Sequence, residues 1–466
     1  MNNNEIRHSE QNTGETRRSF LRKASILGVG GLAGTIGGSS LLCRETAAAP
    51  SGEILRFACI SDTHLGHGKA LQKTARALKV LTAKTPLDKL FVIGDITNMA
   101  RESEYDQVLA VFSDPANLSG SIPVRYITGN HDYADRKDSL SRYTRRTGQE
   151  NDEYVEIKGY PFISAGMTGS STPTVYNDTT RGFLRQSLAD AAAKYAGKPI
   201  FVFAHIPAPN TCYGSRHWHA AKHLDGIFDK YPQVILFTGH SHSPVSHQAS
   251  IWQGTFTAVN DGHITNTDDI SVDKEDGVTT SDGKLTDTPG RYEEVSEGIL
   301  VSVLANGNVE IQRWDVLRDV EIFPRWLVSA PHDGSRFAYR PDSPKPSAPE
   351  FDASVLPSVK TGGGIVTVVI PQAQPSLSVL RYQVNVFRGK PEQAGSGAVL
   401  KEMKDIKDAP AASSGPFSFY YLTADQPKTV EAVFKNLPSG EPLYVCITAI
   451  DHFGTPSKRA WCLEAT

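Results

Sequence analysis

Short apolar runs alternate with stretches of helical periodicity between residue 54 and about residue 314. The runs are rich in β-branched and aromatic residues and are four to seven residues long, which is typical of buried strands. They cover residues 54–60, 90–93, 124–127, 200–204 and 234–237. Residues 69–84 and 181–195 place apolar side chains at helical spacing. This alternation predicts a layered α/β domain rather than a helical bundle.

Two further features shape the end of this domain. Residues 298–303 and 309–314 alternate like strands around Asn306-Gly307-Asn308, which predicts a hairpin. Residues 268–290 contain many Asp, Thr, Ser and Gly residues and almost no large apolar residue. They are predicted to form a mobile surface insertion, with a calcium loop as the alternative because of their carboxylates. The α/β domain is therefore predicted to cover residues 51–340.

The pattern changes after a segment rich in proline. Residues 341–350 contain four prolines and little that could pack, so they are predicted to be a linker. Beyond it the alternation is purely strand-like, over residues 365–370, 380–387, 429–434 and 443–450. This predicts a small all-β sandwich over residues 351–466. Residues 444–454 with Ser457 resemble the closing strands of fibronectin type III domains.

Residues 1–50 are set apart from the fold. Arg17 and Arg18 precede a Gly- and Ala-rich apolar stretch at residues 24–42, followed by small residues at 47–49, and the segment resembles a twin-arginine export signal. The protein is therefore expected in the periplasm or outside the cell. A retained membrane anchor and a lipid attached to Cys43 are the alternatives. No other stretch is long and apolar enough to span a bilayer, so no transmembrane helix is expected in the mature chain.

Composition narrows the possible partners. The 466 residues include 48 basic and 51 acidic side chains, for a formal charge of −3. This balance supports neither the wrapping of nucleic acid nor a polybasic membrane patch. Besides Cys43 there are four cysteines, too few for a disulfide scaffold. Cys446 and Cys462 lie equally far from Gly454 in a predicted hairpin, so a disulfide and two buried thiols both remain open, whereas Cys59 lies in a core strand.

Each of the five predicted strands of the α/β domain ends in polar residues that can bind metal. These residues are Asp62, His64, Asp95, Asn130, His205, His240 and His242. In open α/β sheets ligands bind at the carboxyl ends of the strands, so we expect these side chains at one rim. Singly, each could cap a helix, hold a turn or lie in the core. Together, their oxygen and nitrogen atoms suit first-row transition ions rather than calcium.

Seven ligands are too many for one tetrahedral ion, but two ions sharing one carboxylate accommodate them. Two neighbouring metals can activate a bridging water as a hydroxide nucleophile and clamp an in-line phosphoryl displacement. Iron, manganese and zinc, divalent or trivalent, all suit these ligands. The chemistry therefore predicts an enzyme that acts on a small phosphoester.

The same residues resemble the motif set of the calcineurin-like metallophosphoesterases. The motifs are Asp62-x-His64, Gly94-Asp95, Gly129-Asn130-His131-Asp132, His205 and Gly239-His240-x-His242, over roughly residues 54–315. The resemblance implies a four-layer α/β (α+β) sandwich, in which two facing mixed sheets are flanked by helices. It implies that Asp62, His64 and His242 hold one metal, that Asn130, His205 and His240 hold the other, and that Asp95 bridges them. His131 would contact the phosphoryl group and help the leaving oxygen depart, and Asp132 would orient His131.

The branch of the family is predicted from the residues around Gly94-Asp95. Purple acid phosphatases would require a tyrosine soon after this pair, where Ile96-Thr97-Asn98 stands. Residues 94–98 and 102–105 are similar to the branch that includes cyclic-nucleotide and glycerophosphodiester phosphodiesterases. We therefore expect a phosphodiesterase, with a phosphomonoesterase or an enzyme acting on lipid head groups as alternatives. A binding protein with a relic metal site is the rival from another class, and the complete ligand set argues against it.

Residues 213–219 are the candidate substrate loop. Arg216 and His217 could grip a second phosphate oxygen, and Tyr213 or Trp218 could stack on a base or sugar. The alternative is that these aromatic residues pack on the domain surface. Asn98 and His67 are further candidates for substrate contact. His263 is expected to be structural and His247 to be an exposed side chain. The oligomeric state is left open by the sequence.

Overall fold

The computed structural model describes residues 52–118, 121–134, 138–169, 176–215, 220–265, 295–375, 378–391, 399–400, 410–422, 426–437 and 442–465. All of them belong to one compact unit that covers residues 50–466. The predicted export signal with Cys43, the insertion at residues 268–290, and Arg216, His217 and Trp218 lie outside the described residues. Among the helices that are described, none is both long and apolar enough to cross a membrane.

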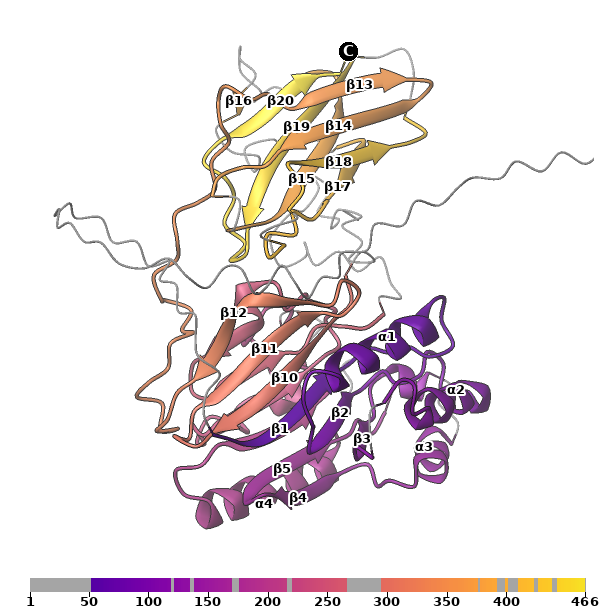
Figure 1. Ribbon diagram of the computed structural model, residues 1–466, viewed down its shortest axis with the longest axis vertical. Coiled ribbons are helices and arrows are strands. Elements are labelled where there is room, and N and C mark those ends of the chain that lie inside the picture. Colours follow the sequence, from indigo (N-terminus) through magenta and orange to yellow (C-terminus); the bar gives the residue numbers. More distant parts are fainter. Residues whose placement is uncertain are drawn as a thin grey trace, which may run out of the picture. The chain divides into compact units, whose positions relative to one another are not determined.

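The first sheet of the α/β domain has six strands in the order β12-β11-β10-β1-β2-β3 (Figure 1). Its strands are β1 (Glu53–Ile60), β2 (Lys89–Ile93), β3 (Val124–Ile127), β10 (Glu297–Leu304), β11 (Val309–Asp315) and β12 (Val320–Val328). β1, β2 and β3 are parallel, whereas β10 pairs antiparallel with β1. The predicted hairpin is formed by β10 and β11, which pair antiparallel.

The second sheet also has six strands, in the order β4-β5-β6-β7-β9-β8. Its strands are β4 (Glu153–Ile157), β5 (Tyr160–Ala165), β6 (Ile200–Ala204), β7 (Val234–Thr238), β8 (Ile251–Gln253) and β9 (Thr257–Asn260). β5, β6, β7 and β9 are parallel to one another, while β4 and β8 are antiparallel edge strands. Both sheets of the α/β domain are therefore mixed.

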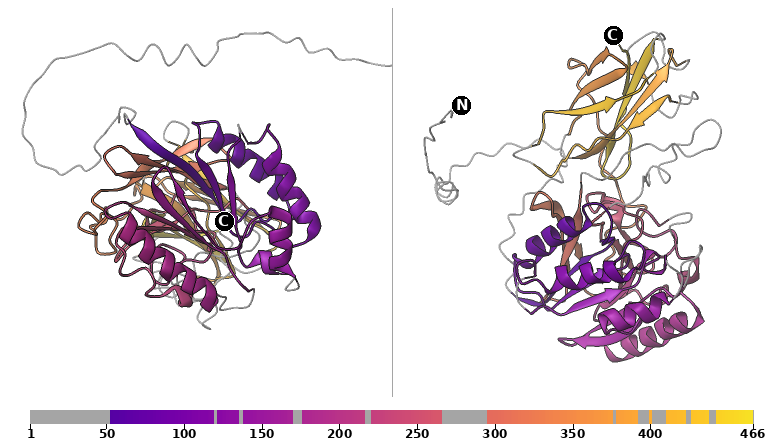
Figure 2. Two further views of the ribbon diagram at one scale, coloured as in Figure 1. Left: turned by 90° about the horizontal axis from the view of Figure 1, so that it is seen from below. Right: turned by 90° about the vertical axis from the view of Figure 1, so that its right-hand side faces the viewer.

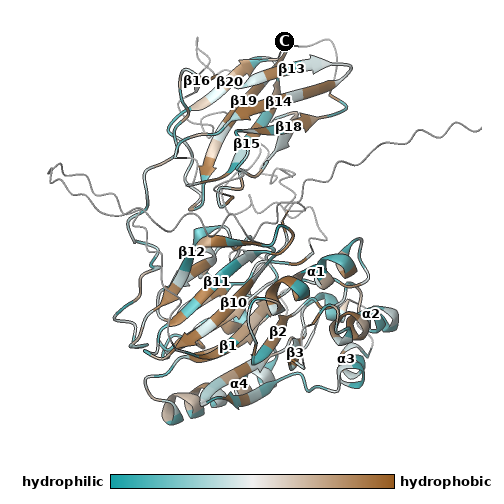
Figure 3. Cartoon of the chain, viewed as in Figure 1, coloured by the Kyte–Doolittle hydropathy of each residue, from teal (hydrophilic) through white to brown (hydrophobic). Residues whose placement is uncertain are grey.

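An aromatic core fills the space between the two sheets. Phe57 of β1 makes edge contacts with rings of both sheets, among them Phe91 at 5.6 Å and Phe203 at 5.9 Å between centroids. The rings of Phe91 and Phe203 stack at 3.9 Å. All three side chains are fully buried, and burial of such a side chain contributes about 1.5–3 kcal/mol. Brown, hydrophobic residues recur along β1, β2 and β10 in Figure 3.

Helices cover the outer faces of both sheets, as Figure 2 shows. α1 (Ala70–Thr82) and α2 (Glu102–Ser113) bury their apolar side chains with those of β1 and β2 on the first sheet. α4 (Asp178–Lys194) packs on β5 and β6 of the second sheet. α3 (Ser139–Thr147) lies beside α2, where Arg142 donates to Glu102. The four-layer sandwich that the sequence resemblance implied is confirmed.

The C-terminal residues form a β-sandwich of two antiparallel sheets. One sheet holds β13 (Ser358–Gly362), β14 (Ile365–Pro371) and β18 (Thr429–Phe434), and the other holds β15 (Val379–Arg388), β16 (Val399–Leu400), β17 (Ala412–Ser414), β19 (Leu443–Asp451) and β20 (Ala460–Glu464). Buried and exposed residues alternate along β18, which gives the sandwich one apolar inner face there. The predicted all-β fold is confirmed, while its resemblance to fibronectin type III domains and the boundaries at residues 340 and 350 stay predictions.

Two cysteines form a bridge across the second sheet of this sandwich. Cys446 of β19 lies opposite Cys462 of β20, and the two form a disulfide. Of the alternatives left open by the sequence, the structure has the disulfide rather than two thiols. Cys59 is buried and not disulfide-bonded, and Cys212 is also buried.

Candidate metal centre

The candidate ligands come from the carboxyl ends of five parallel strands. Asp62 and His64 follow β1, Asp95 follows β2, Asn130 follows β3, His205 follows β6, and His240 and His242 follow β7. Five of these residues have a positive backbone φ: Asp62 (54°), His64 (45°), Asp95 (48°), His240 (67°) and His242 (50°). Such left-handed conformations are unfavourable for non-glycine residues and cluster at functional sites. The chain therefore turns sharply at the rim where the ligands were predicted.

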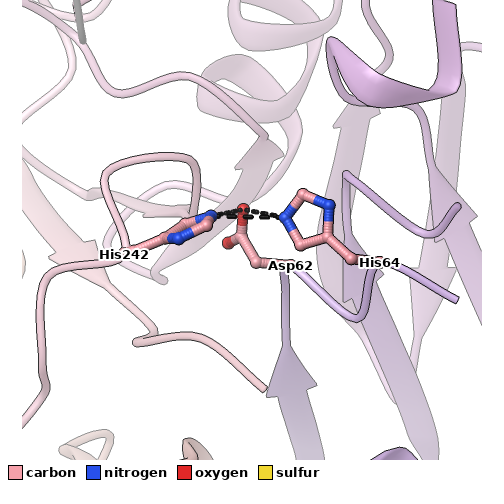
Figure 4. A group of neighbouring side chains, drawn as sticks. All are labelled: Asp62, His64 and His242. Atoms are coloured by element: carbon pink, nitrogen blue, oxygen red, sulfur yellow. Dashed lines mark hydrogen bonds and ion pairs between the residues drawn. The ribbon is translucent and has the colours of Figure 1, made fainter. Parts of the chain in front are cut away.

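One group of possible metal ligands consists of Asp62, His64 and His242. Figure 4 shows their side chains pointing toward one another from two loops, the one after β1 and the one after β7. The Nε2 atom of His242 lies 3.1 Å from Oδ1 of Asp62, and Nε2 of His64 lies 3.8 Å from the same oxygen. All three residues are buried, so an ion bound between them would be shielded from water.

A second group consists of Asp95, His205 and His240. The Nε2 atom of His205 lies 3.2 Å from Oδ2 of Asp95, and Nε2 of His64 from the first group lies 3.8 Å from the same oxygen. His64, Asp95 and His131 form a third group that joins the other two. The Asp95 carboxylate thus stands between the two groups, where a bridging ligand would have to be.

Several buried atoms at this site fit a metal better than they fit a purely structural role. Oδ1 of Asp62, Oδ1 of Asn130 and Nε2 of His205 are buried and make no hydrogen bond to any described residue. The other ring nitrogen of His205, Nδ1, donates to the Ile93 carbonyl at 2.8 Å. This bond fixes the tautomer that leaves Nε2 as an electron-pair donor, as in most metal-binding histidines. The oxygen and nitrogen donors present are suited to first-row transition ions.

The charges of these groups depend strongly on one another. Burial disfavours ionisation of Asp95, but His205 and His131 outweigh it and hold the pKa of that carboxyl well below its usual range. Burial also disfavours protonation of His205, but the carboxylates of Asp95 and Asp62 outweigh it and raise the pKa of the ring to about 10. For His64, burial together with neighbouring imidazoles lowers the pKa despite the Asp95 charge. The site therefore concentrates negative oxygen beside imidazoles.

A polar network behind Asp62 fixes its orientation. The hydroxyl of Ser61 lies 2.5 Å from Oδ2 of Asp62 and 2.7 Å from Oδ1 of Asp261. The backbone N–H of His240 donates to Oδ2 of Asp62 at 3.0 Å, and that of Thr265 donates to the Asp62 carbonyl at 2.9 Å. Three bonds thus hold Asp62 with Oδ1 directed at His242. Burial, together with the Asp62 charge, raises the pKa of Asp261 well above its usual value.

Sequence reasoning missed Ser61 and Asp261. A signal was present, since Asp261 directly follows β9, which ends at Asn260, much as the candidate ligands follow their strands. His263 nearby is fully buried, and its ring stacks on that of His242 at 5.5 Å between centroids. His263 was expected to have a structural role, and its burial and its stacking on His242 are consistent with that role.

His131 lies at the edge of the site on the short 3-10 helix η2 (His131–Tyr133). Its backbone N–H donates to Oδ1 of Asp95 at 2.8 Å, and its ring contacts that of His64 at 4.6 Å between centroids. Nδ1 of the ring donates to the carbonyl of Asn98 at 2.9 Å. The ring is partly exposed, so its Nε2 atom is accessible to a substrate.

The hydrogen bonds of Asp132 differ from those expected from the sequence. We expected its carboxylate to orient His131, but it accepts bonds from the backbone N–H groups of Ile96, Thr97 and Gly129 and from the Thr97 hydroxyl. The Asn98 carbonyl instead orients the His131 ring. The Asp132 carboxylate therefore holds the turn at Ile96 and Thr97, next to Asn98.

The candidate substrate residues are only partly brought to the site. The carbonyl of Asn98 accepts a bond from the His131 ring, and its expected contact with substrate stays a prediction. Tyr213 is 9% exposed, and its ring stacks on that of His247 at 3.8 Å. Tyr213 therefore packs in the core. This is the alternative that the sequence left open for the loop's aromatic residues, in place of stacking on a substrate. His247 is buried rather than exposed as expected. His67 is exposed beside α1.

Comparison with known proteins gives the following similarities. Residues 55–244 match the family model described as calcineurin-like phosphoesterase. A structure of GAP50, the anchor in the inner membrane complex of Plasmodium, aligns with 12% identity and a TM-score of 0.40 over 58% of this chain and 87% of that chain. The purple acid phosphatase PPD1 from yellow lupin (Lupinus luteus) seeds aligns with 12% identity and a TM-score of 0.42 over 60% of this chain and 54% of that chain. No curated protein matches the sequence. Residues 55–244 thus constitute a calcineurin-like phosphoesterase domain, and the Asp and His cluster lies within it.

Proposed function

We propose that the protein is an exported phosphoesterase that needs two metal ions and prefers phosphodiesters. The observation that carries this proposal is the convergence of six candidate ligand side chains from four strand ends, with Asp95 between two groups of possible ligands. Asn130 follows a fifth strand, and its Oδ1 atom is buried without a hydrogen bond to any described residue. Asp62, His64 and His242 would hold one ion, and Asn130, His205 and His240 the other. Iron, manganese or zinc would satisfy these ligands.

The two ions would supply an activated water and would neutralise charge on the phosphoryl group. The protein's own contribution is then to orient the substrate and to move a proton. Because Nδ1 of His131 donates to the Asn98 carbonyl, Nε2 is the ring nitrogen that remains for a substrate. In its protonated form, His131 can donate from Nε2 to the leaving oxygen, so that a diester and water yield a phosphomonoester and an alcohol.

The diester preference is supported by sequence similarity rather than by geometry. Residues 94–98 and 102–105 resemble the phosphodiesterase branch, and residues 94–98 form the turn that carries Asp95 and positions His131. A phosphomonoesterase is the alternative, because the same ligands serve both reactions. Loops such as residues 213–219 would decide between them.

A direct comparison of two synthetic substrates tests this proposal. The protein without residues 1–50 is loaded with manganese, zinc or iron and assayed with bis(p-nitrophenyl) phosphate and with p-nitrophenyl phosphate. We expect a higher kcat/KM on the diester, and Asp95→Asn serves as the inactive control. Preference for the monoester would move the assignment to a phosphatase. Absence of turnover with two ions bound would favour the binding-protein hypothesis.

Export is supported by two independent features. The twin-arginine pattern at Arg17-Arg18 stands before the apolar stretch, and the sandwich carries the Cys446–Cys462 disulfide. Disulfides of this kind persist mainly in oxidising compartments. Replacing both arginines with lysine should retain the protein in the cytoplasm, which cell fractionation would show. Unchanged export of this variant would overturn this part of the proposal.

A further inference from the structure

The loop that carries the last two candidate ligands also contacts the C-terminal β-sandwich. We call residues 239–250 the ligand loop, since it contains His240 and His242 and ends in the 3-10 helix η5 (Gln248–Ser250). Most of its residues are buried. Only three residues separate His242 from Ser246, where the contacts with the sandwich begin.

Two hydrogen bonds join the sandwich to the backbone of this loop. The hydroxyl of Tyr420 donates to the Ser246 carbonyl at 2.8 Å, and the N–H of Gln248 donates to the His452 carbonyl at 2.7 Å. The rings of Tyr420 and His452 lie 5.2 Å apart, so the two contacts form one patch. Tyr420 is 3% exposed, and loss of a buried partner leaves the Ser246 carbonyl unsatisfied.

The sandwich holds both contact residues rigidly. Tyr420 belongs to residues 416–421, and two backbone hydrogen bonds join this segment to β15. The N–H of Tyr382 donates to the Pro416 carbonyl, and the N–H of Ser418 donates to the Leu380 carbonyl, each at 2.9 Å. The N–H of His452 donates to the Ser378 carbonyl at 2.9 Å. Movement of the sandwich's second sheet would therefore carry the contact residues with it.

The phosphoesterase domain holds the ligand loop from the other side. The N–H of Val245 donates to Oε2 of Glu297 at 2.5 Å, and the Arg313 guanidinium donates to the Val245 carbonyl at 2.7 Å. Nε1 of Trp326 donates to the side-chain oxygen of Gln248 at 2.9 Å. These three residues come from β10, β11 and β12. The backbone of residues 245–248 is thus bonded both to these strands and to the sandwich.

Apolar packing joins the same two regions. Leu380, Phe417, Tyr420 and Tyr421 of the sandwich belong to the buried cluster that fills the space between the two sheets of the phosphoesterase domain. The Tyr421 hydroxyl also donates to Oδ2 of Asp315 at 2.9 Å, at the end of β11. The sandwich therefore completes part of the core beside the ligand loop.

We propose that the β-sandwich positions the metal-binding loop, and that Tyr420 is a positioning residue for the ion held through His242. This inference rests on the metal centre proposed above. Metal sites tolerate displacements of only about 0.2 Å in ligand distances. Ser246 is four residues after His242 in the sequence. If its carbonyl lost the bond from Tyr420, the loop could relax, and the imidazole of His242 would move with the backbone.

The test compares two tyrosine-to-phenylalanine variants of the full chain. Tyr420→Phe removes the bond to Ser246 and the hydroxyl's contacts with the side chains of Gln248 and Arg313, all of them at the ligand loop. Tyr382→Phe removes a hydroxyl that bonds Gln372 and Ala373 inside the sandwich, without touching the ligand loop. Manganese binding is measured by isothermal titration calorimetry, with thermal unfolding of the metal-free proteins as the check on folding.

We expect Tyr420→Phe to bind one of the two manganese ions about tenfold more weakly, as is typical when a residue that supports a ligand is lost. Tyr382→Phe should bind both ions with wild-type affinity, even if its thermal stability falls. Unchanged manganese affinity in Tyr420→Phe, or equal losses in both variants, would overturn the positioning role. A wild-type protein that binds fewer than two ions would instead refute the proposed metal centre itself.

Discussion

At the scale of single residues, the site depends on side chains held in unfavourable backbone conformations. Asp95 has a φ of 48° and Asp62 a φ of 54°. Such conformations cost roughly 1–3 kcal/mol each and persist only where neighbouring bonds enforce them. The bonds from His131 to Asp95 and from His240 to Asp62 are of this kind. Loss of a ligand carboxylate should therefore affect metal binding much more than the fold.

Asp95→Asn tests the bridging role. An amide presents one oxygen and no charge, so it cannot serve two ions as a carboxylate does, and we expect kcat/KM to fall at least about 100-fold, since loss of outer partners alone costs roughly 10- to 100-fold. Metal analysis should show fewer than two ions per chain. His131→Ala is the comparison, because it should keep both ions and slow only the reaction. Full activity and two ions in Asp95→Asn would contradict the assignment.

Glu297 makes stability depend on pH. Burial, together with the Asp315 charge, raises the pKa of its carboxyl from 4.5 to about 8. Between these pH values the folded protein keeps the proton and the unfolded chain loses it, so the free energy of unfolding falls as pH rises and levels off above about pH 8. Glu297→Gln cannot ionise and should flatten this dependence. Urea unfolding at several pH values measures it, and identical slopes in both proteins would rule out the effect.

At the scale of elements, the turns after the strands bring the ligands together. Gly94 directly follows β2 and has a φ of 83°. A Cβ atom at this position would lie 2.3 Å from Cγ of His205. The chain can therefore turn toward β6 after β2 only with a glycine at this position. The same close approach places Asp95 beside His205.

Gly94→Ala should lose metal binding and activity because the methyl group displaces the His205 ring. Gly148→Ala is a matched control: its φ is 69°, but a Cβ atom there meets nothing within 4 Å. Both variants carry the conformational cost of a left-handed alanine, whereas only Gly94→Ala disturbs a ligand. Manganese titration distinguishes them, and equal affinities would show that the turn tolerates the methyl group.

At the scale of the whole molecule, the disulfide holds the sandwich together, and the contact of Tyr420 with Ser246 joins it to the α/β domain. Cys446 and Cys462 close a loop with a sequence separation of 16 residues. For loops of this size a disulfide contributes about 3 kcal/mol to stability, mainly by restricting the unfolded chain. The bridge therefore strengthens the part of the protein that supports the ligand loop.

Reduction of this disulfide should lower the free energy of unfolding by about 3 kcal/mol. Guanidinium unfolding with and without reductant measures the change. A variant with serine at both Cys446 and Cys462 should show the lower stability under both conditions, since it cannot form this bridge. An unchanged transition for the wild-type protein in reductant would show that the bridge contributes nothing.

The sequence by itself identified the candidate ligands and the layers of the fold. The strands ending before Asp62, Asp95, Asn130, His205 and His240 were visible because buried strands form continuous apolar runs, a local pattern. The edge strand β4 (Glu153–Ile157) was not visible, because it is partly exposed and carries two glutamates. Its pairing with β5 is what makes it a strand.

Only the tertiary structure decided the contacts between residues distant in the sequence. Stacking buries Tyr213 against His247, Asp132 bonds the Thr97 turn instead of His131, and Tyr420 reaches Ser246 across 174 positions. Such contacts follow no periodicity, because they depend on how separate elements pack. Local patterns therefore determined the elements and their chemistry, whereas packing determined which side chains face the site and what holds them there.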